Sequence, residues 1–467
     1  MSDVVAAARL MRVAAENPEV ELEVLLKKAA PESVGDVLLA VDFTFDEYWR
    51  DEPESVELTA LFSVGADSGA IAVAVLTQAQ FDACAARWRA CSGSPDALFD
   101  ALPVSTFRLD AAVPLQPVSI PKPWGREIWY TGIEQRGVVT VGAPGRGVPL
   151  PWLLAAAPRR LTGGVPQPIL LKILDPLPEP VVGDLYFELH REKREVYVVT
   201  AVDRAAWPDG VGAIRFGFSA ECRRRYADDR AFIAAYLAAV RDYRDVRRRI
   251  DARIDALRAR DGIALNAPVD AATLARWMGE IAPELHGEEA SLRRRMEAFT
   301  GTLPLRVGDV VKVPCLLPHS LQHGVRTVEF QTPVYERLIL SFAQKVLTQA
   351  DWDTEEAAAI LQLDPEPPAP FPVTAQGVGW KRERIVVFDD FEVFRLTLEP
   401  GACVPLEIGG GPGPGYGLGI VVGQALSLAD MRVEPDAAVL LPAAFHPAQL
   451  RNAGSETAYF LLALPLV

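Results

Sequence analysis

The sequence predicts a mainly β protein that carries a long helical insertion and an N-terminal α+β region. Short segments rich in β-branched residues, separated by Gly, Pro and Asp, fill residues 118 to 221 and 376 to 467, a pattern typical of a sandwich or barrel. Residues 222 to 300 instead repeat apolar residues with a period of about 3.6 among dense Arg, Asp and Glu, which predicts helices. At 467 residues the chain is long enough for several domains.

These patterns divide the chain into five parts. Residues 1–115 form an N-terminal α+β region of unknown role, and its first 29 residues predict an amphipathic helix. Residues 116–221 and 301–345 form one β domain, which the helical insertion at 222–300 interrupts. Residues 346–375 are a helical and proline-rich connector, with the helix starting at RLILSFAQKV from residue 337. Residues 376–467 form a second β domain.

Composition excludes several classes of protein. A formal net charge of −15 repels a nucleic-acid backbone, and no run of 18 uncharged apolar residues that could cross a membrane appears. The five cysteines form no CxxC pair, which favours reduced thiols and a cytoplasmic location over a disulfide framework. No nucleic-acid or membrane partner is therefore expected.

The stretch FELHREKREVYVV, residues 187 to 199, holds the first candidate metal ligands. On a strand, Glu188 and His190 point to the same face because side chains alternate with a period of two. A turn after His190 brings Glu195, on the next strand, to the same pocket. A Glu-x-His pair alone is also typical of a solvated strand face, so the metal interpretation depends on a fourth ligand.

A second stretch, GDVVKVPCLLPH, supplies that ligand. Gly308 and Pro314 frame a strand and a tight turn, after which His319 begins the next strand. Two carboxylates and two imidazoles then form a set of four ligands suited to a divalent metal ion. His323 follows four residues later, where a hydrogen-bonding role and simple packing are both open.

Together the two stretches resemble the two motifs of the cupin superfamily. The first cupin motif has a Gly, then two ligands one residue apart, then a Glu; the second has a Gly, a Pro and a His. These positions are Gly183, Glu188, His190 and Glu195 in the first motif, and Gly308, Pro314 and His319 in the second. The resemblance implies that both β domains are cupin jelly-roll barrels. The C-terminal one has no ligand pair and is expected to be metal-free.

Within the cupins, residues 118 to 467 resemble class I mannose-6-phosphate isomerases. KPWGREIWY from residue 122, LKILD from residue 171, the helical insertion between the motifs and the metal-free C-terminal cupin carry this resemblance. It implies one divalent metal ion, zinc in the family, with iron, manganese or nickel as alternatives. The implied ligands are Glu188, His190, Glu195 and His319, with Lys193 at the position of a family lysine and Arg337 at that of a family arginine.

The chain departs from the family at three places. Glu188 stands where the family has Gln, which adds a negative charge beside the metal and weakens it as a Lewis acid. Tyr186 stands where the family has a Ser near the substrate phosphate. The segment between the ligands His190 and Glu195 lacks most of the family's insertion.

The resemblance implies isomerisation of mannose 6-phosphate to fructose 6-phosphate through an enediolate. Lys193 and Arg337 are the expected electrostatic residues, and Arg126, Arg191 and Arg194 are candidates for phosphate contacts. Two alternatives remain open: another metal-dependent cupin enzyme, such as an oxygenase or an isomerase of unphosphorylated sugars, and a non-catalytic carbohydrate-binding cupin.

Overall fold

The computed structural model divides the chain into two compact units, which are described separately. It describes all residues except 1–8, 29–36, 51, 53, 66–69, 92–94, 135–136, 266, 368, 409–414 and 467. The first unit holds residues 1–118, 129–171 and 371–467, and the second holds residues 119–128 and 172–370. Both units consist largely of antiparallel β-sheet, and none of the described helices is long and apolar enough to cross a bilayer.

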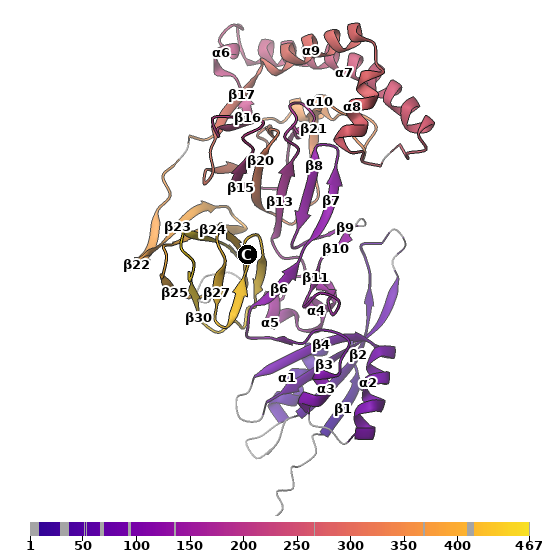
Figure 1. Cartoon of the computed structure of the whole chain (residues 1–467), viewed down its shortest axis with the longest axis vertical. Coiled ribbons are helices and arrows are strands. Elements are labelled where there is room, and N and C mark those ends of the chain that lie inside the picture. The colour runs from indigo at the N-terminus through magenta and orange to yellow at the C-terminus, as the bar shows by residue number, and fades with distance from the viewer. Residues whose placement is uncertain are drawn as a thin grey trace, which may run out of the picture. The chain divides into compact units, whose positions relative to one another are not determined.

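The first unit begins with a five-stranded sheet in the order β1-β2-β3-β4-β5, which helices accompany (Figure 1). Helix α2 packs against β3 and β4, and α1 lies beside β2. The elements are β1 (Arg9–Ala14), α1 (Pro18–Lys28), β2 (Val37–Asp46), β3 (Ser55–Val64), β4 (Ile71–Thr77), α2 (Gln78–Cys91), α3 (Pro95–Asp100) and β5 (Phe107–Arg108).

The helix predicted for the first 29 residues is wrong over residues 9 to 14, which form strand β1. The strand pairs in parallel with β2, and Arg12 reaches Asp42 across that pair at 2.7 Å. The helix begins only at Pro18, whose fixed φ suits a first helical turn, and the side chain of Asn17 accepts a hydrogen bond from the Glu19 N–H. Pairing with β2 therefore overrides the helical period of the sequence.

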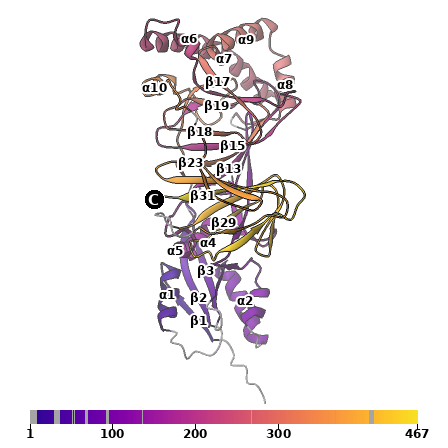
Figure 2. The ribbon, with the colours of Figure 1, turned by 90° about the vertical axis from the view of Figure 1, so that its left-hand side faces the viewer.

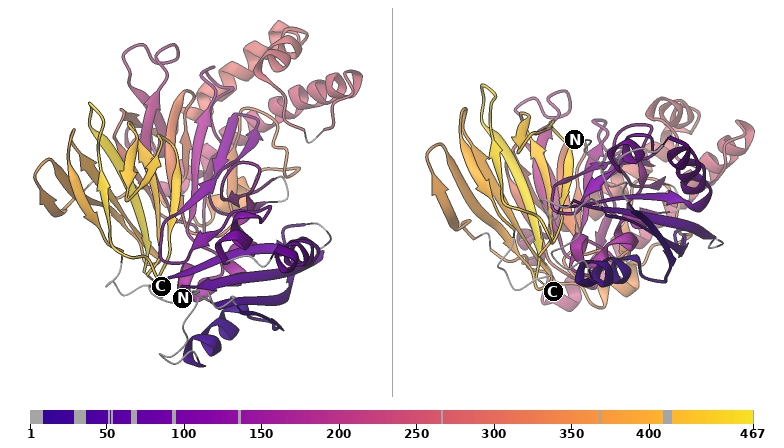
Figure 3. Two further views of the ribbon diagram at one scale, coloured as in Figure 1. Left: turned by 60° about the horizontal axis from the view of Figure 1, so that its bottom comes forward. Right: turned by 90° about the horizontal axis from the view of Figure 1, so that it is seen from below.

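The rest of the first unit is dominated by a nine-stranded and a four-stranded sheet, whose strands run side by side in Figure 3. Their apolar faces form one core that includes Leu396, Val421, Leu441 and Phe460. The elements are β6 (Val113–Gln116), β9 (Ile133–Glu134), β10 (Gly137–Val138), β11 (Thr140–Val141), β12 (Val148–Pro149), α4 (Leu150–Ala156), α5 (Pro158–Thr162), β22 (Val373–Gly377), β23 (Trp380–Val387), β24 (Phe391–Leu398), β25 (Cys403–Leu406), β26 (Gly417–Val422), β27 (Leu426–Leu428), β28 (Met431–Val433), β29 (Ala438–Leu441), β30 (Ala448–Arg451) and β31 (Ala458–Pro465).

The second unit contains a six-stranded sheet, β18-β15-β20-β13-β8-β7, and a five-stranded sheet, β17-β16-β19-β14-β21. Both sheets contribute to one core, for example through Leu174 and Val313 from the first sheet and Ile214 and Leu321 from the second. The strands are β7 (Val118–Lys122), β8 (Gly125–Trp129), β13 (Leu170–Pro176), β14 (Phe187–Leu189), β15 (Glu195–Val202), β16 (Gly212–Phe218), β17 (Thr300–Leu305), β18 (Val310–Val313), β19 (His319–Leu321), β20 (Val325–Gln331) and β21 (Leu338–Ser341).

The other face of the five-stranded sheet packs against helices. Phe187 and Leu189 of β14 join Phe232 and Tyr236 of α7 in a second core, so alternate β14 side chains face the helices. Figure 1 shows α7, α8 and α9 gathered beyond β16 and β17, and Figure 2 shows the same three helices beyond β17. The helices are α6 (Ala220–Arg223), α7 (Asp229–Arg260), α8 (Ala271–Gly279), α9 (Pro283–Glu297) and α10 (Thr354–Ala358).

The sequence interpretation of residues 337 to 363 as one helix is also wrong. Residues 338 to 341 form strand β21, which pairs with β14, and the only helix between 337 and 363 is α10. Leu338, Ile339 and Leu340 are all buried, because successive side chains of β21 enter the two different cores on its two faces. A strand buried on both faces has a continuous apolar run, which periodicity does not distinguish from a buried helix.

Candidate metal centre

Three strands of the second unit bring the predicted ligands together. Glu188 on β14 pairs directly with His319 at the start of β19, and His190 follows the end of β14. Glu195 begins β15, opposite Val313 of β18. Residues 191 to 194 therefore form the turn that carries the chain from one sheet to the other.

The motif glycines make this local geometry possible. Gly308 has a φ of +91°, a conformation that favours glycine, at the turn before β18. Gly183 lies so close to another segment that an added Cβ would stand 1.9 Å from the carbonyl oxygen of Leu177. Only a residue without a side chain fits at position 183, which fixes the approach of the chain to β14.

The side chains of Glu188, His190 and His319 each direct one possible ligand atom to a common region, where these atoms lie within 4.8 Å of one another. Glu195 lies between the two imidazoles. Its Oε1 is 3.4 Å from Nε2 of His190, and its Oε2 is 3.2 Å from Nε2 of His319. His190, Glu195 and His319 are buried, and the Glu188 side chain is 17% exposed.

Backbone carbonyls hold both imidazoles in the orientation that a metal requires. His190 donates from Nδ1 to the carbonyl of Glu336 at 3.0 Å, and His319 donates from Nδ1 to that of Leu317 at 3.0 Å. A neutral imidazole that donates from Nδ1 presents a lone pair at Nε2. Nε2 of each imidazole faces an oxygen of Glu195, so each of these two positions holds either a proton on the nitrogen or a cation bound between the nitrogen and the carboxylate.

Two buried atoms of the cluster lack hydrogen-bond partners, which fits the same conclusion. Nε2 of His190 and Oε2 of Glu188 are buried and make no hydrogen bond. Buried polar atoms are satisfied in most native proteins, so atoms of this kind point to an ion or ligand. The donor set of two imidazole nitrogens and two carboxylates suits a divalent transition metal.

The surroundings of Glu195 keep it ionised. Burial opposes the charge, but Lys193, with Nζ 2.7 Å from Oε1, and the two histidines outweigh it and hold the pKa of Glu195 well below its usual range. The Tyr197 hydroxyl donates a hydrogen bond of 2.6 Å to the other oxygen. Burial and the nearby Lys193 lower the pKa of His190, which favours the neutral imidazole that metal binding needs.

A buried group of lysines and acids, which the sequence did not single out, adjoins Glu195. Lys172 on β13 is buried and lies 3.5 Å from Glu127 and 3.4 Å from Glu329. Burial and Glu195 raise the pKa of Glu329 well above its usual range despite the two nearby lysines. The signal was present in the sequence, since Lys172 is the charged residue in the otherwise apolar run LLKIL.

Arg337 borders the cluster beside Glu188 and Tyr186. Its Nη1 lies 3.8 Å from Oε2 of Glu188, and its guanidinium stacks on the Tyr186 ring at 4.5 Å from the centroid. Phe342 also packs against the Tyr186 ring, with a distance of 4.2 Å between the ring centroids. Burial raises the pKa of Tyr186 to about 12. Tyr186 thus occupies, as a neutral ring, the position where the family resemblance implies a serine.

The remaining candidate residues lie in other contacts. Arg126 pairs with Asp175 at 2.6 Å, and Arg191 pairs with Glu356 at 2.5 Å, so each guanidinium has a carboxylate partner. His323 has both a hydrogen-bonding and a packing role. Its Nδ1 is hydrogen-bonded to Asp184 at 2.7 Å, and its ring stacks on Trp207.

Comparison with known proteins gives a fold but no close relative. No protein-family model matches the chain, and no curated protein matches its sequence. Among solved structures, mannose 6-phosphate isomerase from Bacillus subtilis superposes with a TM-score of 0.50 at 14% identity, over 76% of this chain and 99% of that one. The chain has the fold of mannose 6-phosphate isomerase.

Two further solved structures are similar at a lower level. Phosphomannose isomerase from Salmonella typhimurium gives a TM-score of 0.48 at 12% identity, over 76% of this chain and 100% of that one. A zinc-bound mannose 6-phosphate isomerase gives 0.47 at 11% identity with the same coverage. The predicted resemblance to the mannose 6-phosphate isomerase fold is confirmed by the Bacillus subtilis structure, while the roles of individual residues stay predictions.

Proposed function

We propose that the protein is a metal-dependent aldose–ketose isomerase that converts mannose 6-phosphate into fructose 6-phosphate. The observation that carries this proposal is the convergence of two Nε2 atoms, from imidazoles whose Nδ1 each contacts a backbone carbonyl, on the carboxylate of Glu195. The shared fold with mannose 6-phosphate isomerase supports the same conclusion.

The metal ion would be held by Glu188, His190, Glu195 and His319. Zinc is the expected ion, and two carboxylates with two histidines also suit manganese, iron or nickel. When bound, the ion would supply a Lewis acid at the reacting end of the sugar. Glu188 adds a charge that an amide ligand lacks, so the ion at this site is a weaker Lewis acid than it is beside a glutamine.

The protein's own residues offset charge and handle the proton. An enediolate carries negative charge, and the cations that border the cluster are Lys193, Lys172 and Arg337. Burial raises the pKa of Glu329, and we assign proton exchange to this buried carboxyl group. Tyr197 orients Glu195 through its hydroxyl.

A second candidate function is isomerisation of an unphosphorylated sugar. Arg337 is already engaged by Glu188 and by the Tyr186 ring, so it is less available to a phosphate group. Tyr186 and Phe342 also fill space that a serine at position 186 leaves open. These contacts favour a substrate whose end near Arg337 is uncharged and smaller than a phosphate group.

The test measures turnover of mannose 6-phosphate and of mannose by the zinc-loaded and manganese-loaded protein. Conversion of mannose 6-phosphate supports the first function, and conversion of mannose alone supports the second. Absence of both conversions in protein with one metal ion per chain overturns the isomerase proposal.

A pair of histidine variants links activity to the site. His319→Ala is expected to lose most of its metal and its activity. His446→Ala serves as the matched control, because that side chain is 77% exposed and lies outside the cluster. A His319→Ala protein with a full metal complement contradicts the ligand assignment.

A further inference from the structure

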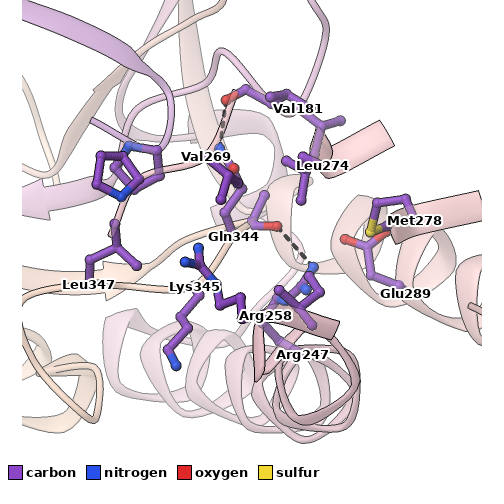
Figure 4. A pocket seen from close by; sticks show the side chains of 15 residues that line it. Val181, Arg247, Arg258, Val269, Leu274, Met278, Glu289, Gln344, Lys345 and Leu347 are labelled. Atoms are coloured by element: carbon purple, nitrogen blue, oxygen red, sulfur yellow. Dashed lines mark hydrogen bonds between the residues drawn. The ribbon is translucent and has the colours of Figure 1, made fainter. Parts of the chain in front are cut away.

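A separate cavity lies in the helical part of the second unit, between helices α7 and α8 and two loop segments (Figure 4). Its volume is about 90 Å³. An apolar wall surrounds it, formed by Val181, Val182, Ile254, Val269, Leu274 and Leu347. The amide of Gln344 donates to the carbonyl of Val182 at 2.6 Å and ties the two loop segments together at its edge.

Four charged side chains also line this cavity, and three of them have carboxylate or guanidinium partners. Arg247 pairs with Asp251 at 2.9 Å, and Lys345 pairs with Asp255 at 2.6 Å. Glu289 pairs with Arg293 at 3.1 Å. Within each pair the two opposite charges neutralise one another, so none of these three residues requires a bound ion.

Arg258 is the fourth charged residue, and it makes no ion pair among the described residues. Its side chain is buried, with the residue only 4% exposed, and its Nε has no hydrogen-bond partner. Nη1 donates to the carbonyls of Ala264 and Ala267, and the guanidinium lies 5.7 Å from the centroid of Trp277. These contacts hold the adjoining loop. Burial lowers the pKa of Arg258 although Asp255 and Asp251 attract its charge, and these two aspartates already pair with Lys345 and Arg247. A buried cation without a counter-ion of its own is costly.

We propose that this cavity binds a short aliphatic carboxylate, with its anionic group at Arg258 and its alkyl chain against the apolar wall. The single unpaired cation selects one negative charge, and guanidinium groups match carboxylates through paired N–H donors. A cavity of about 150 Å³ accommodates benzene, so a volume of 90 Å³ suits about four or five heavy atoms. Propionate has this size, and its ethyl group suits the wall.

The probe is propionate itself, titrated against the metal-loaded full-length protein by saturation-transfer NMR. A ligand of five heavy atoms binds with a dissociation constant of about 1 mM at a moderate efficiency per atom. Propionamide has the same shape without the charge, and it is expected to bind at least about tenfold more weakly. Equal binding of the two molecules, or no saturable binding of propionate at about 30 mM, overturns the proposal.

Two variants test the site independently, one by removing the guanidinium group and the other by filling the cavity. Arg258→Met is expected to weaken propionate binding about tenfold or more. Because Arg258 also holds the adjoining loop, Leu347→Trp provides a second test, since it fills the cavity and leaves the guanidinium in place. Arg276→Met is the control, because Arg276 lies over the same Trp277 ring, is 53% exposed and pairs with Asp261.

Propionate binding is independent of the proposed isomerase function. His319→Ala is therefore expected to retain it while losing metal. If Leu347→Trp and Arg258→Met both bind propionate as tightly as the unchanged protein, the cavity is not the binding site.

Discussion

Glu188 gives the sharpest prediction, because it is where the ligand set differs from the family that the sequence resembles. Glu188→Gln keeps the shape of the side chain and an oxygen ligand but removes one negative charge. We expect this variant to bind divalent metal about 10- to 100-fold more weakly, which corresponds to roughly 1.4 to 2.8 kcal/mol.

The same substitution also affects the metal-free protein through Arg337. A charge pair 3.8 Å apart interacts by about 4 kcal/mol at an effective dielectric constant of about 20. Because the two side chains are 26% and 17% exposed, screening by solvent reduces the expected loss of unfolding free energy to about 1 to 2 kcal/mol.

Metal affinity is measured by competition with a chromophoric chelator, and stability is measured by urea unfolding of the chelated protein. Glu192→Gln is the matched control, since Glu192 is exposed and lies two residues beyond His190. If Glu188→Gln binds metal as tightly as the unchanged protein, Glu188 is not a ligand and the charge argument is wrong.

Three further predictions concern the protein around the site. Lys172→Met removes the buried cation that Glu127 and Glu329 share, which leaves Glu127 with Lys122 alone and makes a charge on Glu329 still more costly. Urea unfolding is expected to show a loss of about 3 kcal/mol, and a loss under about 1 kcal/mol contradicts this. Because the folded-state pKa of Glu329 is raised above its ordinary value of 4.5, the unchanged protein loses stability as pH rises through that value toward the folded pKa, by up to about 1.4 kcal/mol per pH unit. Glu329→Gln removes this penalty, so its advantage in urea unfolding should grow from pH 5 to pH 8, and a pH-independent difference would refute the argument. Gly183→Ala places a Cβ 1.9 Å from the Leu177 carbonyl oxygen and should lower the free energy of unfolding by at least about 2 kcal/mol. Gly287→Ala meets open space in α9 and should raise the free energy of unfolding by about 0.5 to 1 kcal/mol. Thermal unfolding of the two variants checks both signs.

The approach of Glu188, His190 and His319 to one another followed from the sequence because local rules fix it. Alternation along a strand places Glu188 and His190 on one side, and the glycine and proline positions set the turns that bring Glu195 and His319 to them. The apolar run around Lys172 indicates a buried strand, but the carboxyl partners of Lys172 depend on which strands lie beside β13, and no local pattern encodes that order.

Other features could not be predicted from the sequence because they also depend on contacts between segments that are distant along the chain. Residues 9 to 14 and 338 to 341 become strands because neighbouring strands offer unsatisfied backbone groups, and this pairing outweighs local helical periodicity. The carbonyls of Glu336 and Leu317 that orient the imidazoles are backbone atoms, so sequence letters carry no sign of them. The isolated charge of Arg258 also appears only once the helices are packed, because in sequence it stands among regularly spaced acids and arginines.

The most direct test of the metal centre is anomalous diffraction from crystals of the protein purified without chelator, with data collected on both sides of the metal absorption edge. The ligand arrangement predicts one anomalous peak within about 2.0 to 2.3 Å of His190 Nε2, His319 Nε2 and a carboxylate oxygen of Glu195 and of Glu188. A fully occupied peak elsewhere, or no peak at this cluster in crystals grown with excess zinc or manganese, would contradict it.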